Sequence, residues 1–406
     1  MLSRISGFQG LRLEYFIAFV LLFNAFSWYF FCDLTISNIE GIYTTGSFES
    51  ISLQLAYPIS IIISAILASV SLTHASKKHF FIFWILGGIG SSVSSAFLLE
   101  SPLMVKLAII VFMGASFGIG MPRCLNYFTD LIPIEKRGKI GGITFLAIVA
   151  SAVLFIMTSP KLDPTTNAIV LVTWRGWSLA ALHFAPKNKE TFEDLGERKK
   201  ADYGFPWNRT FFLYFTTWFM FALVSGFGSN IASFYGSNYL GYLKVIEPSI
   251  GGLSAVVSGA FSDWIGRKRV ITFGFASLGL AYAVLGLAPE MLFSWFFFYI
   301  IDGIAMGLLW VSFIVVLWGE ISRNGTEKSY AIGEAPYFLT GIVSSLLAPF
   351  TSLIPRTSAF SLAALFLFVA VLPLMYAPET LPEKKIKDRE LKQYIDKAKK
   401  TKEKYT

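Results

Sequence analysis

Charged side chains are scarce in this sequence. Asp, Glu, Lys and Arg make up 15% of the 406 residues, whereas an ordinary soluble domain carries about 25%. Hydrophobic types reach 54% and the mean hydropathy is +0.60. A soluble fold of this length needs more polar surface than these residues provide. The composition therefore disfavours a soluble enzyme, excludes a disordered or fibrous chain, and predicts a polytopic membrane protein.

Cysteine and histidine are scarce as well. Cys32 and Cys124 lie in apolar runs and give neither a disulfide framework nor metal-ligand spacing. His74, His79 and His183 lie at or near predicted span ends, without a catalytic triad or metal companions. No glycine-rich phosphate loop occurs. We therefore expect no cofactor and no metal, and both a membrane-embedded enzyme and an ATP-driven pump are disfavoured.

Long apolar runs are abundant. A helix needs about 20 apolar residues to cross roughly 30 Å of hydrocarbon. The sixth candidate is the least regular, because Arg175 interrupts it, and an eleven-span chain would place its termini on opposite sides. The twelve candidates are 13–34, 51–73, 80–99, 103–128, 141–158, 168–186, 210–235, 248–265, 270–288, 291–318, 331–354 and 357–377.

Lysine and arginine are distributed unevenly between the connections. If twelve spans start from a cytoplasmic N-terminus, the cytoplasmic segments hold 28 of the 34 basic residues and the opposite side holds three. The positive-inside rule then predicts a multi-pass protein of the cell membrane with both termini in the cytoplasm. The same asymmetry accounts for the net charge of +8 without a nucleic-acid partner.

A charged stretch from Lys187 to Asn208 divides the spans into two sets of six. A shift of 190 residues places the basic triplet 267–269 on 77–79 and Glu320 on Asp130, and such internal repetition is typical of transporters. The predicted organisation is an N-terminal six-helix bundle at 1–186, a central cytoplasmic loop at 187–209, a C-terminal six-helix bundle at 210–377 and a basic cytoplasmic tail at 378–406.

The most specific local pattern lies between spans eight and nine. Glycines at 259 and 266 allow close approach of backbones, and Asp263 can accept hydrogen bonds from a helix N-terminus or an arginine. An ordinary positive-inside turn is the alternative interpretation. The pattern resembles the signature loop of the major facilitator superfamily, which braces the closed inner face and does not touch substrate. Its residues are Gly259, Asp263, Gly266, Arg267, Lys268 and Arg269.

This resemblance implies an all-α membrane protein with twelve transmembrane helices in two pseudo-symmetric six-helix bundles. The superfamily usually keeps the better copy of the loop in the first half of the chain. Here Thr73 stands in place of the acid and Ser76 in place of the glycine. The resemblance therefore implies that gating depends on the second-half copy.

Two further segments are similar to particular branches of the superfamily. Gly118-Ile-Gly-Met-Pro122, followed by Asp130 and Arg137-Gly138, is similar to the fourth span of proton-coupled sugar and organic-acid transporters. Ala377-Pro-Glu-Thr is similar to the ending of sugar porters, although span seven lacks their paired glutamines. The resemblance implies cytoplasmic charge pairs that break and re-form during transport, with solvated interfacial charge as the alternative. These residues are Asp130, Arg137, Asp263, Arg267 and Glu320.

Charges inside spans are costly, at roughly 2.5–3.5 kcal/mol near the centre on insertion scales, so each is a functional candidate. Asp302 lies near the middle of span ten and has a structural partner in the bundle as its alternative role. Asp33 resembles the span-one aspartate that carries the proton in many symporters of this group, although a place at the outer interface explains it equally well. Arg175 follows Trp174, as in the pair that often opens span six of this family, and we expect an outer-interface anchor there.

Spans one, four, seven and ten line the cavity in this superfamily. For polar residues in these spans the alternative is a satisfied contact between helices. Arg123 has three interpretations, as an anion ligand, as the partner of an acid, or as a side chain that extends to the cytoplasm. The substrate-cavity candidates implied by the resemblance are Asn24, Arg123, Asn126, Asn230 and Trp310.

The predicted function is secondary active transport of a small organic solute, either a sugar or an organic acid, by alternating access. We expect protons as the coupling ion, carried by Asp33 or Asp302, and a monomer whose other partner is the lipid bilayer. A facilitator or an exporter of the same fold is the first alternative. A transport-inactive solute sensor or scaffold is the alternative from another class.

Overall fold

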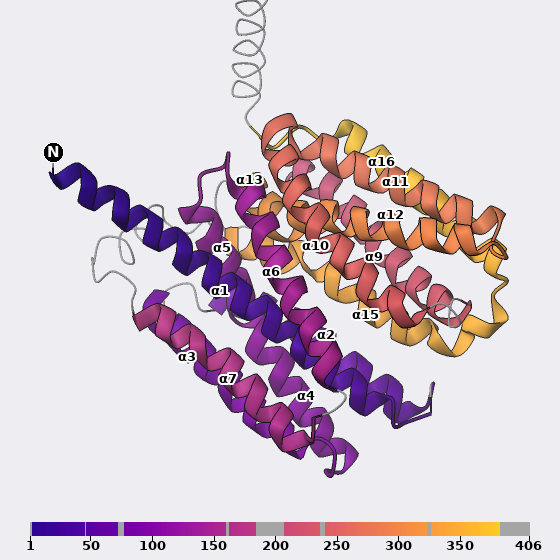
Figure 1. Cartoon of the computed structure of the whole chain (residues 1–406), viewed down its shortest axis with the longest axis horizontal. Coiled ribbons are helices and arrows are strands. Elements are labelled where there is room, and N and C mark those ends of the chain that lie inside the picture. The colour runs from indigo at the N-terminus through magenta and orange to yellow at the C-terminus, as the bar shows by residue number, and fades with distance from the viewer. Residues whose placement is uncertain are drawn as a thin grey trace, which may run out of the picture.

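The computed structural model describes residues 2–44, 46–71, 77–159, 162–183, 207–235, 240–322 and 326–381, and its helices form two groups (Figure 1). Thr73 and Ser76 lie outside the described residues. So do most of the central loop predicted at 187–209 and the tail beyond residue 381.

The first group holds the helices up to His183. Figure 1 shows α3 and α7 on the side of this group that faces away from the second. Its members are α1 (Leu2–Glu40), α2 (Phe48–Ser71), α3 (Lys77–Ser94) with η1 (Ser95–Phe97), α4 (Leu103–Gly118) with α5 (Met121–Leu131), α6 (Arg137–Thr158) and α7 (Pro164–His183).

The second group repeats this arrangement. Its members are α9 (Arg209–Tyr235), α10 (Leu240–Ile265), α11 (Arg267–Leu287), α12 (Leu292–Trp310) with η4 (Val311–Leu317) and α13 (Trp318–Ile321), α14 (Thr326–Gly333) with α15 (Ala335–Leu347) and η5 (Ala348–Leu353), and α16 (Arg356–Tyr376). The segment η4 is a π-helix that continues α12.

Twelve helical rods thus correspond to the twelve predicted spans. Among the described residues, eleven rods are long and apolar enough to cross a membrane. The exception is α7, the sixth span, which has 20 residues and carries Arg175 in its middle. It packs against α1 and α3 as an integral member of its bundle. The predicted fold is therefore confirmed.

The same pairs of helices pack in both bundles. In the first bundle α2 packs on α4 and α3 on α7, and in the second the corresponding pairs are α10 on α12 and α11 on α16. Likewise α1 on α6 corresponds to α9 on α15. Between the bundles, α6 packs on α10 and α2 packs on α14 and α15. The repeat inferred from the 190-residue shift is thus visible in the packing.

Small residues bring α6 and α10 together. The backbones of Gly138 and Gly259 are so close that a Cβ on Gly259 would lie 2.1 Å from the carbonyl oxygen of Gly138. One turn further, a Cβ on Gly142 would lie 2.2 Å from the carbonyl oxygen of Ala255. The close approach places the ends of α6 and α10 where polar groups of the two bundles meet.

Candidate functional site

The signature-loop aspartate joins the two bundles. Asp263, at the end of α10, accepts hydrogen bonds from the backbone N–H groups of Gly138 (2.9 Å) and Lys139 (2.7 Å). These groups lie in the first turn of α6, where N–H groups have no partner within the helix and the helix dipole favours negative charge. A carboxylate of the second bundle therefore caps a helix of the first. We call the end of the molecule that carries Asp263, Arg137 and Glu320 the motif face.

Arg267 is the centre of this contact. Its side chain is fully buried and forms ion pairs with Asp263 (2.6 Å) and Glu320 (3.1 Å). It also donates a hydrogen bond to the carbonyl oxygen of Ile134, just before α6 (2.8 Å). A guanidinium has five N–H donors in a fixed fork, which suits several acceptors at once. Arg267 thus ties two acids of its own bundle to the backbone of the other.

Two more ion pairs cross between the bundles at the motif face. Arg137 lies 4.0 Å from Glu320 and also donates hydrogen bonds to backbone carbonyls at the end of α5. Arg123 pairs with Glu327 of α14 at 3.0 Å, with its guanidinium 4.4 Å from the ring centroid of Phe80. Of the three interpretations of Arg123, the structure places it beside an acid.

Asp130 and Glu320 lie at the same face, as the repeat predicts. Asp130 is exposed near the end of α5, and the neighbouring residue Thr129 accepts a hydrogen bond at its carbonyl oxygen from Arg137. Glu320 belongs to α13, which contacts α5. The two acids therefore occupy corresponding ends of the fourth span in each half.

The Pro-Glu-Thr segment is part of the same network, which sequence reasoning missed. Glu379 accepts hydrogen bonds from the backbone N–H groups of Arg267 (2.8 Å) and Lys268 (3.1 Å) and so caps α11. Lys268 in turn donates to two carbonyl oxygens at the end of α16, and Thr380 donates to Glu320 (2.7 Å). Gly266 has φ of 106°, in the region that favours glycine, and a Cβ there would lie 2.4 Å from the Glu379 carboxylate.

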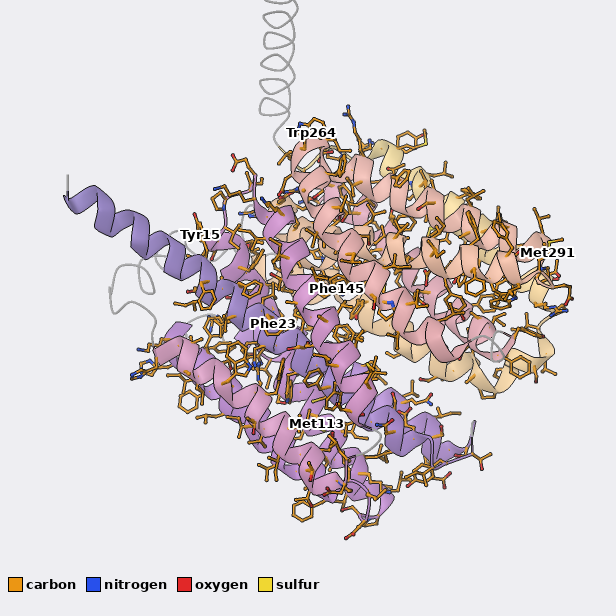
Figure 2. The ribbon with its side chains drawn as sticks, in the orientation of Figure 1. Tyr15, Phe23, Met113, Phe145, Trp264 and Met291 are labelled. Carbon is orange, nitrogen blue, oxygen red and sulfur yellow. The ribbon has the colours of Figure 1, made fainter. Side chains whose placement is uncertain are left out.

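Aromatic rings fill the boundary between the bundles further into the membrane. Trp310 of α12 stacks on Phe145 of α6 at 4.2 Å between ring centroids and meets Phe26 of α1 edge-on at 5.3 Å. Figure 2 shows Phe145 at the boundary between the two bundles. Tyr29 of α1 contacts Phe338 of α15 at 5.7 Å. Trp310 directly precedes the π-helix η4, and such irregular turns frequently occur at functional sites.

Asp33 lies on the same face of α1 as Phe26 and Tyr29, because these residues follow helical spacing. Its side chain is exposed, and it interacts electrostatically with Tyr29, Tyr57 and Tyr337. Tyr337 belongs to the second bundle. The structure thus places an accessible carboxyl group beside tyrosines of both bundles.

Arg175 is not the interface anchor that the sequence suggested. Its side chain is 1% exposed, at the middle of α7, and it donates a hydrogen bond to the side-chain oxygen of Asn24 (2.9 Å). The guanidinium also lies 4.3 Å from the ring centroid of Trp84 and 5.2 Å from that of Trp28. A delocalised cation stacks well on indole faces. This contact holds the predicted cavity residue Asn24 inside the N-terminal bundle, away from the boundary.

The other two predicted cavity asparagines occupy different surroundings. Asn230 donates hydrogen bonds to the backbone carbonyls of Gly226 (3.4 Å) and Ser344, so it joins α9 to α15. Asn126 is half-buried on α5, one turn from Arg123. Its side-chain oxygen is buried and has no hydrogen-bond partner within the described part of the chain.

Asp302, on α12, has a partner that the sequence did not indicate. Its carboxyl group lies within interaction range of that of Glu247 on α10. Glu247 lies outside the eighth span predicted at 248–265, whereas α10 begins at Leu240 and includes it. The Glu-Pro pair at 247–248 resembles the polar edge of a span, but α10 continues through Pro248.

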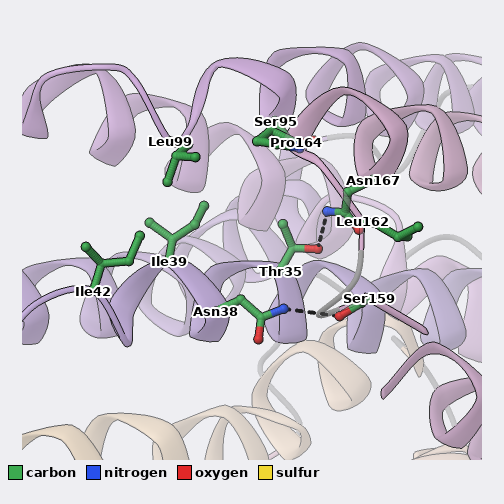
Figure 3. Close-up of a pocket in the computed structure, with 10 residues that line it drawn as sticks. All are labelled: Thr35, Asn38, Ile39, Ile42, Ser95, Leu99, Ser159, Leu162, Pro164 and Asn167. Atoms are coloured by element: carbon green, nitrogen blue, oxygen red, sulfur yellow. Dashed lines mark hydrogen bonds between the residues drawn. The ribbon is translucent and has the colours of Figure 1, made fainter. Parts of the chain in front are cut away.

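A cavity of about 340 Å³, lined by both polar and apolar side chains, lies within the N-terminal bundle (Figure 3). Asn38 donates to Ser159 (3.1 Å) and Asn167 donates to Thr35 (2.9 Å) across this cavity. None of the ten lining side chains is charged. The cavity belongs to one bundle only, so it does not lie on the boundary where the predicted site residues Asp33 and Trp310 are found.

Two solved structures share this architecture. The human organic anion transporter MFSD10 (TETRAN) is similar with a TM-score of 0.64 and 13% sequence identity, over 90% of this chain and 99% of its own. A bacterial homologue of the iron transporter ferroportin, in an outward-facing state, is similar with a TM-score of 0.65 and 14% identity, over 90% of this chain and 97% of its own. Neither a family model nor a curated protein sequence matches the chain. The protein therefore has the major facilitator fold, with twelve helices in two six-helix bundles.

Proposed function

We propose that this protein is a secondary transporter of a small organic solute that works by alternating access. The observation that carries the proposal is the composition of the contact at the motif face. Four separable polar contacts cross between the bundles there: Asp263 on the α6 N-terminus, Arg267 on the backbone before α6, and the pairs Arg137–Glu320 and Arg123–Glu327. None of the four is a covalent or interlocked connection.

The energy scale of these contacts suits a conformational switch. A capping or charge-assisted hydrogen bond contributes on the order of 1 kcal/mol. Moving a two-state equilibrium from 1:99 to 99:1 requires about 5.5 kcal/mol. A few such contacts therefore suffice to hold the motif face closed, and binding of a solute and an ion can supply enough free energy to open it.

The finer features of the proposal rest on the residues at the boundary. We propose that a sugar or an organic acid is the solute, that protons drive its movement, and that Asp33 and Asp302 are the carboxyl groups that carry them. Both termini are then cytoplasmic, the membrane is the cell membrane, and the bundles divide as 1–186 and 210–377. One solved structure with this fold is described as an organic anion transporter, which supports the carboxylate class.

Uptake into vesicles that contain the purified protein tests this function. We expect a panel of sugars and small carboxylates to include at least one solute that accumulates when an inward pH gradient is imposed. Asp33→Asn should reduce this accumulation, because the amide cannot release and take up a proton. Solute movement that ignores the gradient would identify a facilitator. Binding without any movement would identify a sensor.

Asp263→Asn tests the role of the motif face. The amide oxygen can still cap α6, but the variant loses its charge and hence its ion pair with Arg267, at a cost of about 1–3 kcal/mol to the closed state. We expect a transport rate reduced by roughly tenfold, since each 1.4 kcal/mol is a factor of ten, with solute affinity nearly unchanged. A selective loss of affinity would instead indicate that Asp263 contacts the solute.

A further inference from the structure

The two acids in the middle of the C-terminal bundle face each other. Glu247 lies on α10 and Asp302 on α12, and their carboxyl groups are close enough to interact directly. An ionised carboxylate can only accept hydrogen bonds. Two adjacent carboxylates therefore offer each other no hydrogen bond and repel, whereas one proton between them turns the contact into a hydrogen bond.

Close packing of the two helices fixes this geometry. A Cβ on Gly303, the residue after Asp302, would lie 2.6 Å from the carbonyl oxygen of Glu247. α12 therefore approaches the backbone of α10 at the pair itself, and the two side chains have little freedom to separate while the helices stay packed. By the helical rise, Asp302 lies about 15 Å from the outer end of α12, which is near the middle of the bilayer.

Tyrosines surround the pair among the side chains that the structure describes. The described side chains that interact electrostatically with it are Tyr282 of α11 and Tyr299 of α12, both 4% exposed. The charged residues of α6, Arg137 and Lys139, lie in its first turn at the motif face, and α9 has only Arg209 at its start. The side chain of Lys244, on α10, is not among those described. Two adjacent negative charges repel each other strongly, so ionisation of both acids at once is disfavoured.

A second observation marks this place as a binding site. The hydroxyl group of Tyr299 is buried and has no hydrogen-bond partner among the described residues, yet it belongs to the electrostatic surroundings of both acids. Buried polar groups nearly always have a partner. The Tyr299 hydroxyl is a hydrogen-bond donor without an acceptor in the part of the chain that the structure describes, and it lies beside two carboxyl groups. This arrangement suits a site that gains a negative charge when a proton leaves.

We propose that Glu247 and Asp302 together form a proton-binding site that holds one proton between them at neutral pH. We further propose that the pair, and not Asp302 alone, carries the coupling proton. This second statement rests on the proposed transport function. In the protonated form the pair has one negative charge, shared through the hydrogen bond. Release of the proton to water leaves two carboxylates, and the Tyr299 hydroxyl can then donate to one of them.

Infrared spectroscopy of the purified full-length protein tests the site without any transport. pH-difference spectra of wild type should show the C=O band of a protonated carboxyl group at neutral pH. Glu247→Gln and Asp302→Asn should each remove the same component of this band, because neither remaining acid then has a carboxylate with which to share its proton. Asp163→Asn is the control, because this acid is exposed just before α7, and it should leave the band in place.

Several outcomes would overturn the proton site. These are the absence of the band from wild type at neutral pH, a band that both variants leave unchanged, and its loss when sodium ions are added at constant pH, which would identify a sodium site. The wild-type titration decides the question even if a variant fails to fold.

Uptake assays in vesicles test the coupling separately. Glu247→Gln and Asp302→Asn should lose accumulation driven by a pH gradient but retain exchange of solute across the membrane, because exchange requires no net proton movement. Accumulation that survives in Glu247→Gln would overturn the shared site as the coupling element. If wild type shows the infrared band but transports no solute, the proton site stands and the proposed function fails.

Discussion

Arg267→Gln is expected to open the motif face. The substitution removes the cation that two acids share, and it leaves Asp263 and Glu320 buried and close together. Removing one partner of a buried ion pair costs about 3–5 kcal/mol, because the remaining charge is left without compensation. Separation of the bundles at this face relieves the cost, since water can then reach both acids. The closed state should therefore lose most of its population.

The accessibility of a buried position reports this opening. Thr129, beneath the contact, is 2% exposed, so a Thr129→Cys background should react slowly with a membrane-impermeant thiol reagent. Adding Arg267→Gln should raise the rate roughly a hundredfold or more, at a factor of ten per 1.4 kcal/mol. Arg269→Gln is the matched control. It removes the same charge two residues further along the chain, where the arginine side chain is exposed. Equal rates in the two variants would show that the Arg267 network does not close the face.

The number and order of the helices could be predicted from the sequence because the bilayer imposes one length on every span. The interruption of α7 by Arg175 did not change the count, since a helix whose polar side chain has partners in its bundle need not be apolar throughout. Span ends were less accurate. α10 begins at Leu240, eight residues before the predicted start, because the helix continues through Glu247 and Pro248 beyond the apolar run.

The partners of the site residues could not be predicted in the same way. The sequence shows that Asp263 suits a helix N-terminus or an arginine, and the structure adds that the helix belongs to the other bundle. Asn24 and Arg175 are 151 positions apart, so no local pattern connects them. Glu379 gave a signal, because an acid just beyond the end of one helix can cap the N-terminus of a neighbouring helix. Only the folded chain shows that this neighbour is α11.

Gly259→Ala is expected to prevent closure of the motif face while leaving each bundle folded. The added Cβ would lie 2.1 Å from the carbonyl oxygen of Gly138 on the other bundle, and a backbone atom cannot move aside as a flexible side chain can. The clash forces α6 and α10 apart at the place where Asp263 must reach the first turn of α6, so the capping hydrogen bonds are lost together with the close packing.

Gly341→Ala is the control, because Gly341 also faces the other bundle but its added Cβ would meet Pro58 at 3.8 Å, an ordinary contact distance. In vesicles, Gly259→Ala should abolish solute accumulation and raise the labelling of Thr129→Cys as Arg267→Gln does. Gly341→Ala should behave as wild type in both assays. Normal transport by Gly259→Ala would mean that the transport cycle does not require the α6–α10 contact, and alternating access through the motif face would then be wrong.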